Sequence, residues 1–209
     1  MKTEWEHSFR PVPLHHQSLD SATQGLGMPS AKDTSGGRVI WITGLSGAGK
    51  TTLARALLEH LPGAILLDGD ELREVLGAAQ SGFDADSRKR LALTYARMAR
   101  LLAGQGFTVI VATISLFHAV HAWNREHLPG YLEVFLDVPE GERRRRDPKG
   151  LYAAEQAGRV TAMAGGETRV ELPLSPHLHL DAALSVEESA RRILEHCGPP
   201  REQDRGRHS

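Results

Sequence analysis

A glycine-rich loop at residues 44–51 places the strongest constraint on the fold of this chain. The loop reads GLSGAGKT and matches the pattern G-x-x-x-x-G-K-[ST] at every fixed position. Its glycines let the backbone N–H groups point inward at phosphate oxygens, while Lys50 adds a positive charge and Thr51 a hydroxyl for Mg²⁺. The pattern predicts a P-loop between a strand and a helix, with phosphate contacts from Gly44, Leu45, Ser46, Gly47, Ala48, Gly49, Lys50, Thr51 and Thr52.

Strand and helix patterns alternate through the central part of the sequence. Short apolar runs predict strands at 38–43, 64–67, 107–113, 131–137 and 177–181. Apolar positions that recur every three or four residues predict helices at 51–60, 86–104 and 186–196. In the longest of these helices the apolar stripe consists of Leu91, Tyr95, Met98 and Leu102. The alternation predicts an α/β protein, a single domain with a P-loop NTPase-type parallel sheet and helices on both faces.

The length and the composition of the chain suit one such domain. Of the 209 residues, 40% are hydrophobic and 24% are charged, which is close to the globular average. The ends lack any apolar period and are rich in polar residues, proline and glycine. We therefore expect a flexible N-terminal extension at 1–37, a P-loop kinase domain at 38–197 and a flexible C-terminal tail at 198–209.

Charge and hydropathy exclude several functional classes. The 25 Lys and Arg balance 26 Asp and Glu, and the net charge of -1 excludes a generally basic nucleic-acid binder. The longest apolar stretch, Phe107–Phe117, is too short to cross a bilayer, and the N-terminal residues show no signal-peptide pattern. The single cysteine, Cys197, cannot form an internal disulfide. These features predict a cytoplasmic protein without a nucleic-acid or membrane partner.

Two acidic residues follow the second predicted strand. Asp68 and Asp70 flank a glycine, and side chains at positions i and i+2 of an extended segment project the same way. Both carboxylates are therefore expected to face the mouth of the P-loop. There one can hold Mg²⁺ or its water, and the other can take a proton from an acceptor hydroxyl.

A run of four arginines, Arg143–Arg146, follows the fourth predicted strand, and Lys149 comes shortly after it. Small kinases carry at this place a lid whose basic residues close on the phosphates. We interpret Arg146 and Lys149 as functional, and Arg143 and Arg144 as a solvated helix face.

Features that the sequence lacks narrow the class of P-loop protein. A GTPase would carry the guanine-reading motif N-K-x-D, but the one asparagine of the chain, Asn124, lies within NREH. Motors and helicases are normally longer. A small kinase remains, with ATP and Mg²⁺ as its cofactors.

Several motifs together resemble those of the adenylylsulfate (APS) kinases. GLSGAGKTT, LLDGDELR, GFDADSR, ATIS, YLEVFLDVP and RDPKGLY occur in this order between about Val39 and His196. The resemblance implies the fold derived above, a homodimer, and a small nucleotide as acceptor. It also implies transfer of a phosphoryl group from MgATP to the ribose 3′-hydroxyl of adenosine 5′-phosphosulfate, which gives 3′-phosphoadenylylsulfate and ADP in sulfate activation.

The resemblance further implies roles for individual residues. Asp70 would be the base toward the 3′-hydroxyl, while Asp68 and Thr51 hold the metal. Ser115 matches a family serine described as a phosphoserine intermediate, but we favour in-line transfer with Ser115 as a substrate contact. The implied catalytic residues are Lys50, Asp68, Asp70, Ser115 and Lys149. The implied acceptor site consists of Arg73 and Arg88 on the phosphosulfate, Phe83 and Met163 on the base, and Ile114, Ser115 and Lys149, while Arg146 contacts ATP.

The sequence departs from the family pattern on the acceptor side. Leu91 stands where the family has a substrate-contacting asparagine, His118 replaces an arginine, and Met163 replaces an aromatic residue. Three functions therefore stay open: an APS kinase, a related kinase acting on another nucleotide-linked hydroxyl such as a cytidine diphosphate conjugate, and a non-catalytic nucleotide-binding subunit. His118 and His121 either cap a helix or lie on its surface, or they contact the acceptor.

Overall fold

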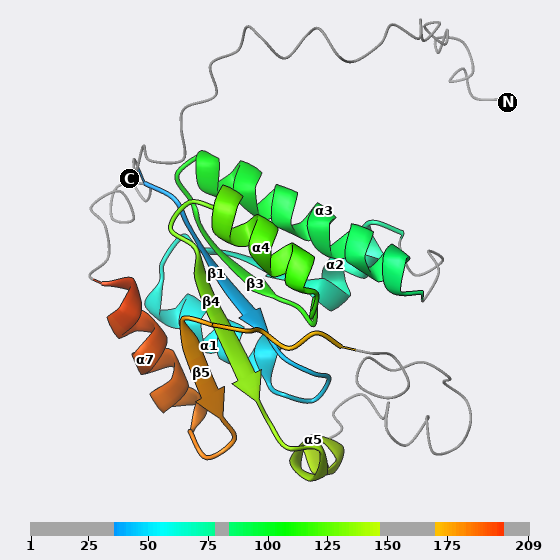
Figure 1. Ribbon diagram of the computed structural model, residues 1–209. Coiled ribbons are helices and arrows are strands. Elements are labelled where there is room, and N and C mark those ends of the chain that lie inside the picture. The colour runs from blue at the N-terminus through cyan, green and yellow to red at the C-terminus, as the bar shows by residue number, and fades with distance from the viewer. Residues whose placement is uncertain (1–35, 78–83, 147–169, 199–209) are drawn as a thin grey trace, which may run out of the picture. The chain divides into compact units, whose positions relative to one another are not determined.

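The computed structural model describes residues 36–77, 84–146 and 170–198, and strands and helices alternate along them (Figure 1). In chain order the elements are β1 (Arg38–Thr43), α1 (Lys50–His60), β2 (Ile65–Asp68), α2 (Gly69–Val75), α3 (Ala85–Gly104), β3 (Thr108–Ala112), α4 (His118–His127), β4 (Leu132–Asp137), α5 (Glu140–Arg146), β5 (Leu178–Asp181) and α7 (Val186–Cys197). Within the described ranges no helix is both long and apolar enough to cross a membrane. Residues 1–35 and 199–209 lie outside these ranges, so the domain boundaries stay predictions.

The strands form a five-stranded parallel sheet in the order β2-β3-β1-β4-β5. In the middle of the sheet, Ile40 of β1 lies opposite Ile110 of β3 on one side and opposite Leu132 of β4 on the other. After β1 the chain first builds one half of the sheet with β2 and β3, and then the other half with β4 and β5. The predicted α/β fold is confirmed, and the strand order reverses beside β1, where ligands bind in folds of this kind.

Alternate residues of β1 point to opposite faces of the sheet and contribute to two separate cores. Ile40 and Ile42 belong to the core that also contains Leu57 of α1 and is completed by α7. Val39 and Trp41 belong to the core that α3 and α4 cover. Figure 1 shows α3 and α4 on one face of the sheet and α1 and α7 on the other. All six residues of β1 are buried, as expected for a parallel strand with helices on both sides.

The region after β2 differs from the sequence prediction. The strand continues to Asp68, and α2 begins at the next residue. The side chain of Asp68 accepts a hydrogen bond of 2.9 Å from the backbone N–H of Asp70, which makes Asp68 the N-cap of α2. The prediction that Asp68 and Asp70 lie on one extended segment is therefore wrong, because the chain turns into a helix between them.

Leu57 tests the core between α1 and the sheet. Its side chain is fully buried, at 0% exposure. Leu57→Ala leaves a cavity there and is expected to lower the free energy of unfolding by about 2–5 kcal/mol, measured by urea unfolding. Leu101→Ala on α3 is the matched control, because Leu101 is 65% exposed, and it should change this free energy by at most about 0.5 kcal/mol. Equal losses in the two variants would contradict this packing.

Candidate active site

The carboxyl ends of β1, β2 and β3 lie at one edge of the sheet and are joined by hydrogen bonds. The backbone N–H of Thr113 donates to the carbonyl of Ile42 over 3.1 Å, and the hydroxyl of Thr43 donates to the carbonyl of Ile114. A Cβ atom placed on Gly69 would lie 2.9 Å from Oγ1 of Thr113, so the turn between β2 and α2 packs closely against the residue that follows β3. Residues that leave these three strands therefore meet at one place.

The P-loop has the backbone conformation that its glycines predict. Gly47 and Gly49 have φ angles of 77° and 94°, in the left-handed region that favours glycine. A Cβ atom on Gly47 would also lie 3.0 Å from the carbonyl oxygen of Arg143. The ammonium group of Lys50 donates to the carbonyl of Leu45 over 2.9 Å and thus lies across the loop. Since α1 begins at Lys50, the positive end of this helix lies at the loop, where an anion binds favourably.

Thr51 and Asp68 are in direct contact at the bottom of the site. The hydroxyl of Thr51 donates to Oδ2 of Asp68 over 2.6 Å, and Asp68 is only 4% exposed. A hydroxyl and a carboxylate are hard oxygen ligands, which fit Mg²⁺. The other acidic residue, Asp70, is exposed in the first turn of α2.

Tyr95 of α3 is part of this region, although the sequence analysis assigned it to the apolar stripe alone. Its hydroxyl donates to the carbonyl of Gly69 over 3.2 Å. Burial raises the pKa of Tyr95, the charge of Arg73 lowers it, and the charges of Asp70 and Asp68 add to the increase. The sequence could not reveal this contact, because the spacing of Tyr95 indicates only that it belongs to the apolar face of its helix.

Arg73 of α2 and Arg88 of α3 lie close enough to interact electrostatically. The pKa of Arg88 is lowered because burial disfavours its charge and because Arg73 repels it, while Asp84 partly offsets both effects. Two guanidinium groups that repel each other are stabilised when an anion binds to both. The structure thus brings these two predicted acceptor residues together.

Ser115 follows β3 in an uncommon backbone conformation. It is the one residue other than glycine with a positive φ angle (29°) in the described part of the chain, and it is only 6% exposed. Its hydroxyl lies 2.9 Å from that of Thr113. Its carbonyl accepts hydrogen bonds from the backbone N–H of Phe117 and from a ring nitrogen of His121, each over 3.0 Å.

The interpretation of His121 as a cap or surface residue is wrong, because its side chain is buried and bonds to the backbone of Ser115, while acceptor contact stays a prediction. His118, by contrast, lies in the first turn of α4. Its backbone N–H donates to the carboxylate of Glu171 over 2.6 Å, and its ring lies 2.9 Å from the carbonyl of Leu172. The N-terminus of α4 is thus capped by Glu171, a residue distant in sequence.

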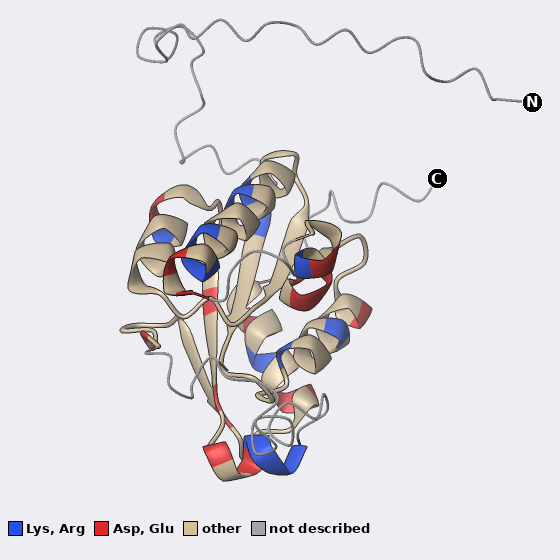
Figure 2. Ribbon diagram, turned by 90° about the vertical axis from the view of Figure 1, so that its right-hand side faces the viewer, with Lys and Arg blue, Asp and Glu red and all other residues tan. Residues whose placement is uncertain are grey.

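In the arginine run, the division into buried and exposed side chains differs from the prediction. Arg143 is 7% exposed and donates to the carbonyl of Val138 over 2.9 Å, so its interpretation as solvated is wrong. Arg144 is exposed and paired with Glu140 over 2.7 Å, as predicted. Figure 2 shows the acidic first turn and the basic last turn of α5 next to each other. The run contains a buried arginine because α5 packs its first arginine against the end of β4.

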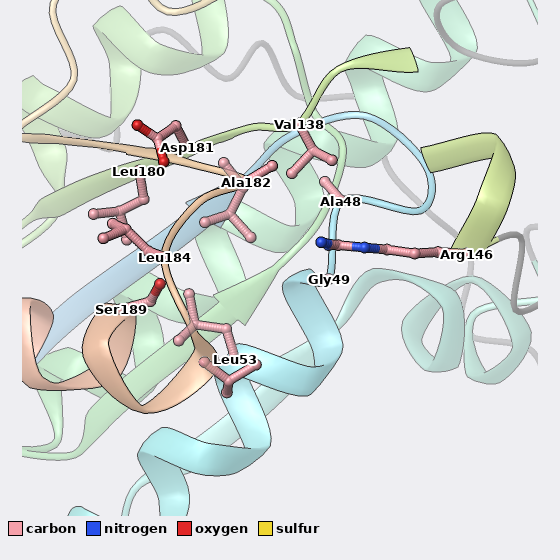
Figure 3. Close-up of a pocket in the computed structure, with 12 residues that line it drawn as sticks. Ala48, Gly49, Leu53, Val138, Arg146, Leu180, Asp181, Ala182, Leu184 and Ser189 are labelled. Atoms are coloured by element: carbon pink, nitrogen blue, oxygen red, sulfur yellow. The ribbon is translucent and has the colours of Figure 1, made fainter. Parts of the chain in front are cut away.

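Arg146 borders a small, mainly apolar pocket beside the P-loop (Figure 3). One wall comes from the P-loop and α1, with Ala48, Gly49 and Leu53. The opposite wall comes from β5 and the residues after it, including Ala182 and Leu184. Asp181 and Ser189 also line the pocket, and apolar walls with a guanidinium at the rim, next to a phosphate-binding loop, suit the base of a nucleotide.

Some predicted residues cannot be located. Phe83, Lys149 and Met163 lie outside the described residues, so their roles stay predictions. Ile114 lies between Thr113 and Ser115, is half-buried, and uses its carbonyl to bind Thr43.

Comparison with known proteins gives concordant matches. A sequence profile of the family described as Adenylylsulphate kinase matches residues 36–181. Cytidine diphosphoramidate kinase of Campylobacter jejuni is 38% identical over 161 residues, which cover 75% of this chain and 89% of the relative. Adenylyl-sulfate kinase of Deinococcus deserti is 41% identical over 167 residues, which cover 78% and 92%. The APS kinase CysC of Mycobacterium tuberculosis, solved with AMPPNP and APS, matches with a TM-score of 0.69 at 37% identity and covers 76% of this chain and 96% of its own.

Lys50→Ala tests the role of the P-loop. Removal of the ammonium group eliminates a charge that offsets the phosphates in the transition state, so kcat of phosphoryl transfer should fall by roughly 10²-fold or more. Arg55→Ala on the same helix is the matched control, because Arg55 is exposed and paired with Glu71 at 3.6 Å, outside the loop. Near-normal turnover in the Lys50 variant, measured by ADP release, would refute the assignment.

Proposed function

The chain belongs to the adenylylsulfate kinase family, and we propose that it transfers the γ-phosphoryl group of ATP to a ribose hydroxyl of a small nucleotide. The observation that carries this proposal is the contact of 2.6 Å between Thr51 of the P-loop and Asp68 of β2. It supports a site where bound phosphates lie near a second carboxylate, Asp70, that can accept a proton. Since the named family members are kinases, we do not retain the non-catalytic alternative.

ATP is the proposed donor, held by the P-loop residues Gly44–Thr52. The backbone N–H groups of the loop and of the first turn of α1 contact the phosphates, and Lys50 exchanges the carbonyl of Leu45 for a phosphate oxygen. The pocket beside Arg146 takes the base of ATP. Mg²⁺, held by Thr51 and Asp68, offsets charge on the phosphates when it is bound.

On the acceptor side, the chain's own residues bind the nucleotide and remove one proton. The hydroxyl oxygen of the acceptor forms the new bond to phosphorus, and ADP leaves. The carboxylate of Asp70 takes the proton of that hydroxyl. Arg73 and Arg88 hold the charged groups at the 5′ end of the acceptor, and their mutual repulsion supports this role. Ser115 contacts the acceptor without forming a covalent intermediate.

The acceptor that we propose first is adenylyl sulfate, which would yield 3′-phosphoadenylylsulfate and ADP. Two arguments support it: the family match covers the whole sheet and P-loop, and a relative that is 41% identical carries the name adenylyl-sulfate kinase. The motif residues Asp70, Arg73, Arg88 and Ser115 are all present in this chain. The transfer would proceed directly to the 3′-hydroxyl.

A cytidine diphosphate conjugate is the second candidate acceptor. It is supported by two residues of the acceptor side, Leu91 and His118, that differ from the family pattern. Leu91 packs against the core of α3 and the sheet, so no amide is available there for the acceptor. His118, which stands where the family has an arginine, places its ring 2.9 Å from the carbonyl of Leu172. A relative named cytidine diphosphoramidate kinase has an identity of 38%, similar to that of the sulfate-activating relatives.

Two further expectations accompany the proposal. A homodimer stays a prediction based on the family resemblance. A cytoplasmic location stays a prediction from the sequence.

Exchange of each aspartate for asparagine separates their roles. Asp70→Asn keeps the shape but removes the base, so kcat should fall by about 10²–10⁴-fold with the acceptor KM largely preserved. Asp68→Asn should mainly raise the Mg²⁺ concentration needed for half-maximal rate, because Asp68 contacts Thr51. Single-turnover rates at saturating Mg²⁺ measure the chemical step. An unchanged rate in Asp70→Asn together with a collapsed rate in Asp68→Asn would reverse the assignment.

A panel of acceptors tests the proposed substrate. ADP release from MgATP is measured with adenylyl sulfate, cytidine diphosphate, cytidine diphosphoramidate and adenosine monophosphate. We expect the highest kcat/KM with adenylyl sulfate. Turnover of a cytidine nucleotide without turnover of adenylyl sulfate would move the conclusion to the second candidate. Absence of turnover with all acceptors would contradict the proposed function.

A further inference from the structure

A cluster of polar side chains, three of them buried, links α4 to β4 away from the P-loop. This α4–β4 cluster consists of His121, Asn124, Arg125, Tyr131 and Glu133. Glu133 is fully buried, at 0% exposure. Its Oε2 atom lies 2.8 Å from a guanidinium nitrogen of Arg125 and accepts a hydrogen bond of 3.1 Å from the hydroxyl of Tyr131. A buried carboxylate is strongly unfavourable without such partners, and none of these contacts belongs to the reaction described above.

The second oxygen of Glu133 faces His121. Oε1 of Glu133 lies 3.4 Å from Nδ1 of the imidazole, and both atoms are buried without another hydrogen-bond partner among the described residues. Oε1 of Glu133 therefore lies beside the ring on one side. The hydrogen bond of the ring is made on the other side, by Nε2.

That contact leads to the candidate active site. Nε2 of His121 lies 3.0 Å from the carbonyl oxygen of Ser115, and because a carbonyl can only accept, Nε2 must carry a proton. Ser115 has a φ angle of 29°, which a residue with a side chain adopts only when its surroundings hold it there. The same residue presents its hydroxyl to Thr113, next to the turn that leads to Asp70.

We propose that His121 is a positioning residue for the acceptor side of the site. Through its Nε2 contact it holds the backbone of Ser115 in the left-handed conformation and thereby fixes the place of the Ser115 hydroxyl. The proposal rests on the proposed function, because Ser115 must contact the acceptor for its position to affect the reaction.

Burial and several nearby charges act on the pKa of His121. Burial lowers the pKa of His121, and the positive charges of His118 and Arg125 on the same helix lower it further. Glu133 from β4 and the carbonyl of Ser115 raise it without cancelling the effect of burial. Tyr131, directly before β4, donates to Oε2 of Glu133, the oxygen that does not face the ring. Whatever the state of Nδ1, the form that bonds to the carbonyl of Ser115 carries a proton on Nε2.

Two substitutions at one position separate positioning from packing. His121→Phe fills a similar space but donates no hydrogen bond, and it is expected to raise the KM for adenylyl sulfate at least tenfold, since small misplacements of reacting groups cost up to roughly 10²-fold. His121→Gln can still donate to Ser115 through its amide nitrogen and should stay within about threefold of the parent. KM for ATP should stay within about twofold in both variants, because the P-loop is not involved.

His127→Gln is the matched control. His127 lies on the same helix and stacks on Trp123, far along α4 from Ser115, so its loss should leave the acceptor KM unchanged. Similar KM increases in the phenylalanine and glutamine variants of His121, or no increase in the phenylalanine variant, would contradict the proposal. The same would follow if the control raised the acceptor KM as much as His121→Phe does. If the acceptor panel assigns the reaction to cytidine diphosphoramidate, the same comparison is made with that compound.

Two measurements test the contact without any acceptor, so they distinguish its failure from failure of the proposed function. The ¹⁵N resonances of His121 in the parent protein should show a proton on Nε2 at neutral pH. A proton on Nδ1 alone would contradict the geometry, whether or not the variants fold. Hydrogen exchange at the amide of Phe117, which donates to Ser115, should be faster in His121→Phe than in His121→Gln. Equal exchange in the two variants would also overturn the proposal.

Discussion

The hydrogen bond from Thr51 to Asp68 joins the two segments on which the rest of the site depends. Thr51 lies in the first turn of α1, directly after the P-loop, and Asp68 ends β2, which lies two strands away in the sheet. Asp68 also caps α2 through its other oxygen, which accepts from the backbone N–H of Asp70 and so holds Asp70 in the first turn of that helix. One buried carboxylate thus fixes the phosphate-binding loop relative to the proposed base. The parallel sheet makes this possible, because the carboxyl ends of all its strands lie at one edge.

The acceptor side depends on contacts between elements that are distant in sequence. Tyr95 of α3 holds the carbonyl of Gly69, and His121 of α4 holds that of Ser115. In both cases a side chain from a covering helix bonds to the backbone of a turn at the end of a strand. Glu171, after the segment 147–169, caps α4 and so connects the last part of the chain to the same edge. The proposed acceptor site is therefore built on turns that the helices keep in place.

The sequence predicted the elements whose signal is local. β1 and β3 are continuous buried runs, and their predicted bounds agree with the structure within one residue. The P-loop was recognisable because its glycines and Lys50 carry their function in fixed positions. α2 was missed because D-G-D resembles a turn, and the capping role of Asp68 becomes visible only once the chain is folded. Arg143 and His121 were misinterpreted for the same reason. Arg143 bonds to the carbonyl of Val138, and His121 contacts Ser115 and Glu133. These partners follow from the packing of the folded chain, and the spacing of residues in the sequence does not reveal them.

The central claim is that acceptor and donor meet where β1, β2 and β3 end, and a crystal structure with Mg²⁺, ADP and adenylyl sulfate tests it most directly. The account predicts the phosphates of ADP against Gly44–Thr51, the metal on Thr51, and the sulfate of the acceptor between Arg73 and Arg88. It also predicts the 3′-hydroxyl within hydrogen-bonding distance of Asp70. Adenylyl sulfate bound elsewhere, or bound with its 3′-hydroxyl directed away from Asp70, would contradict it.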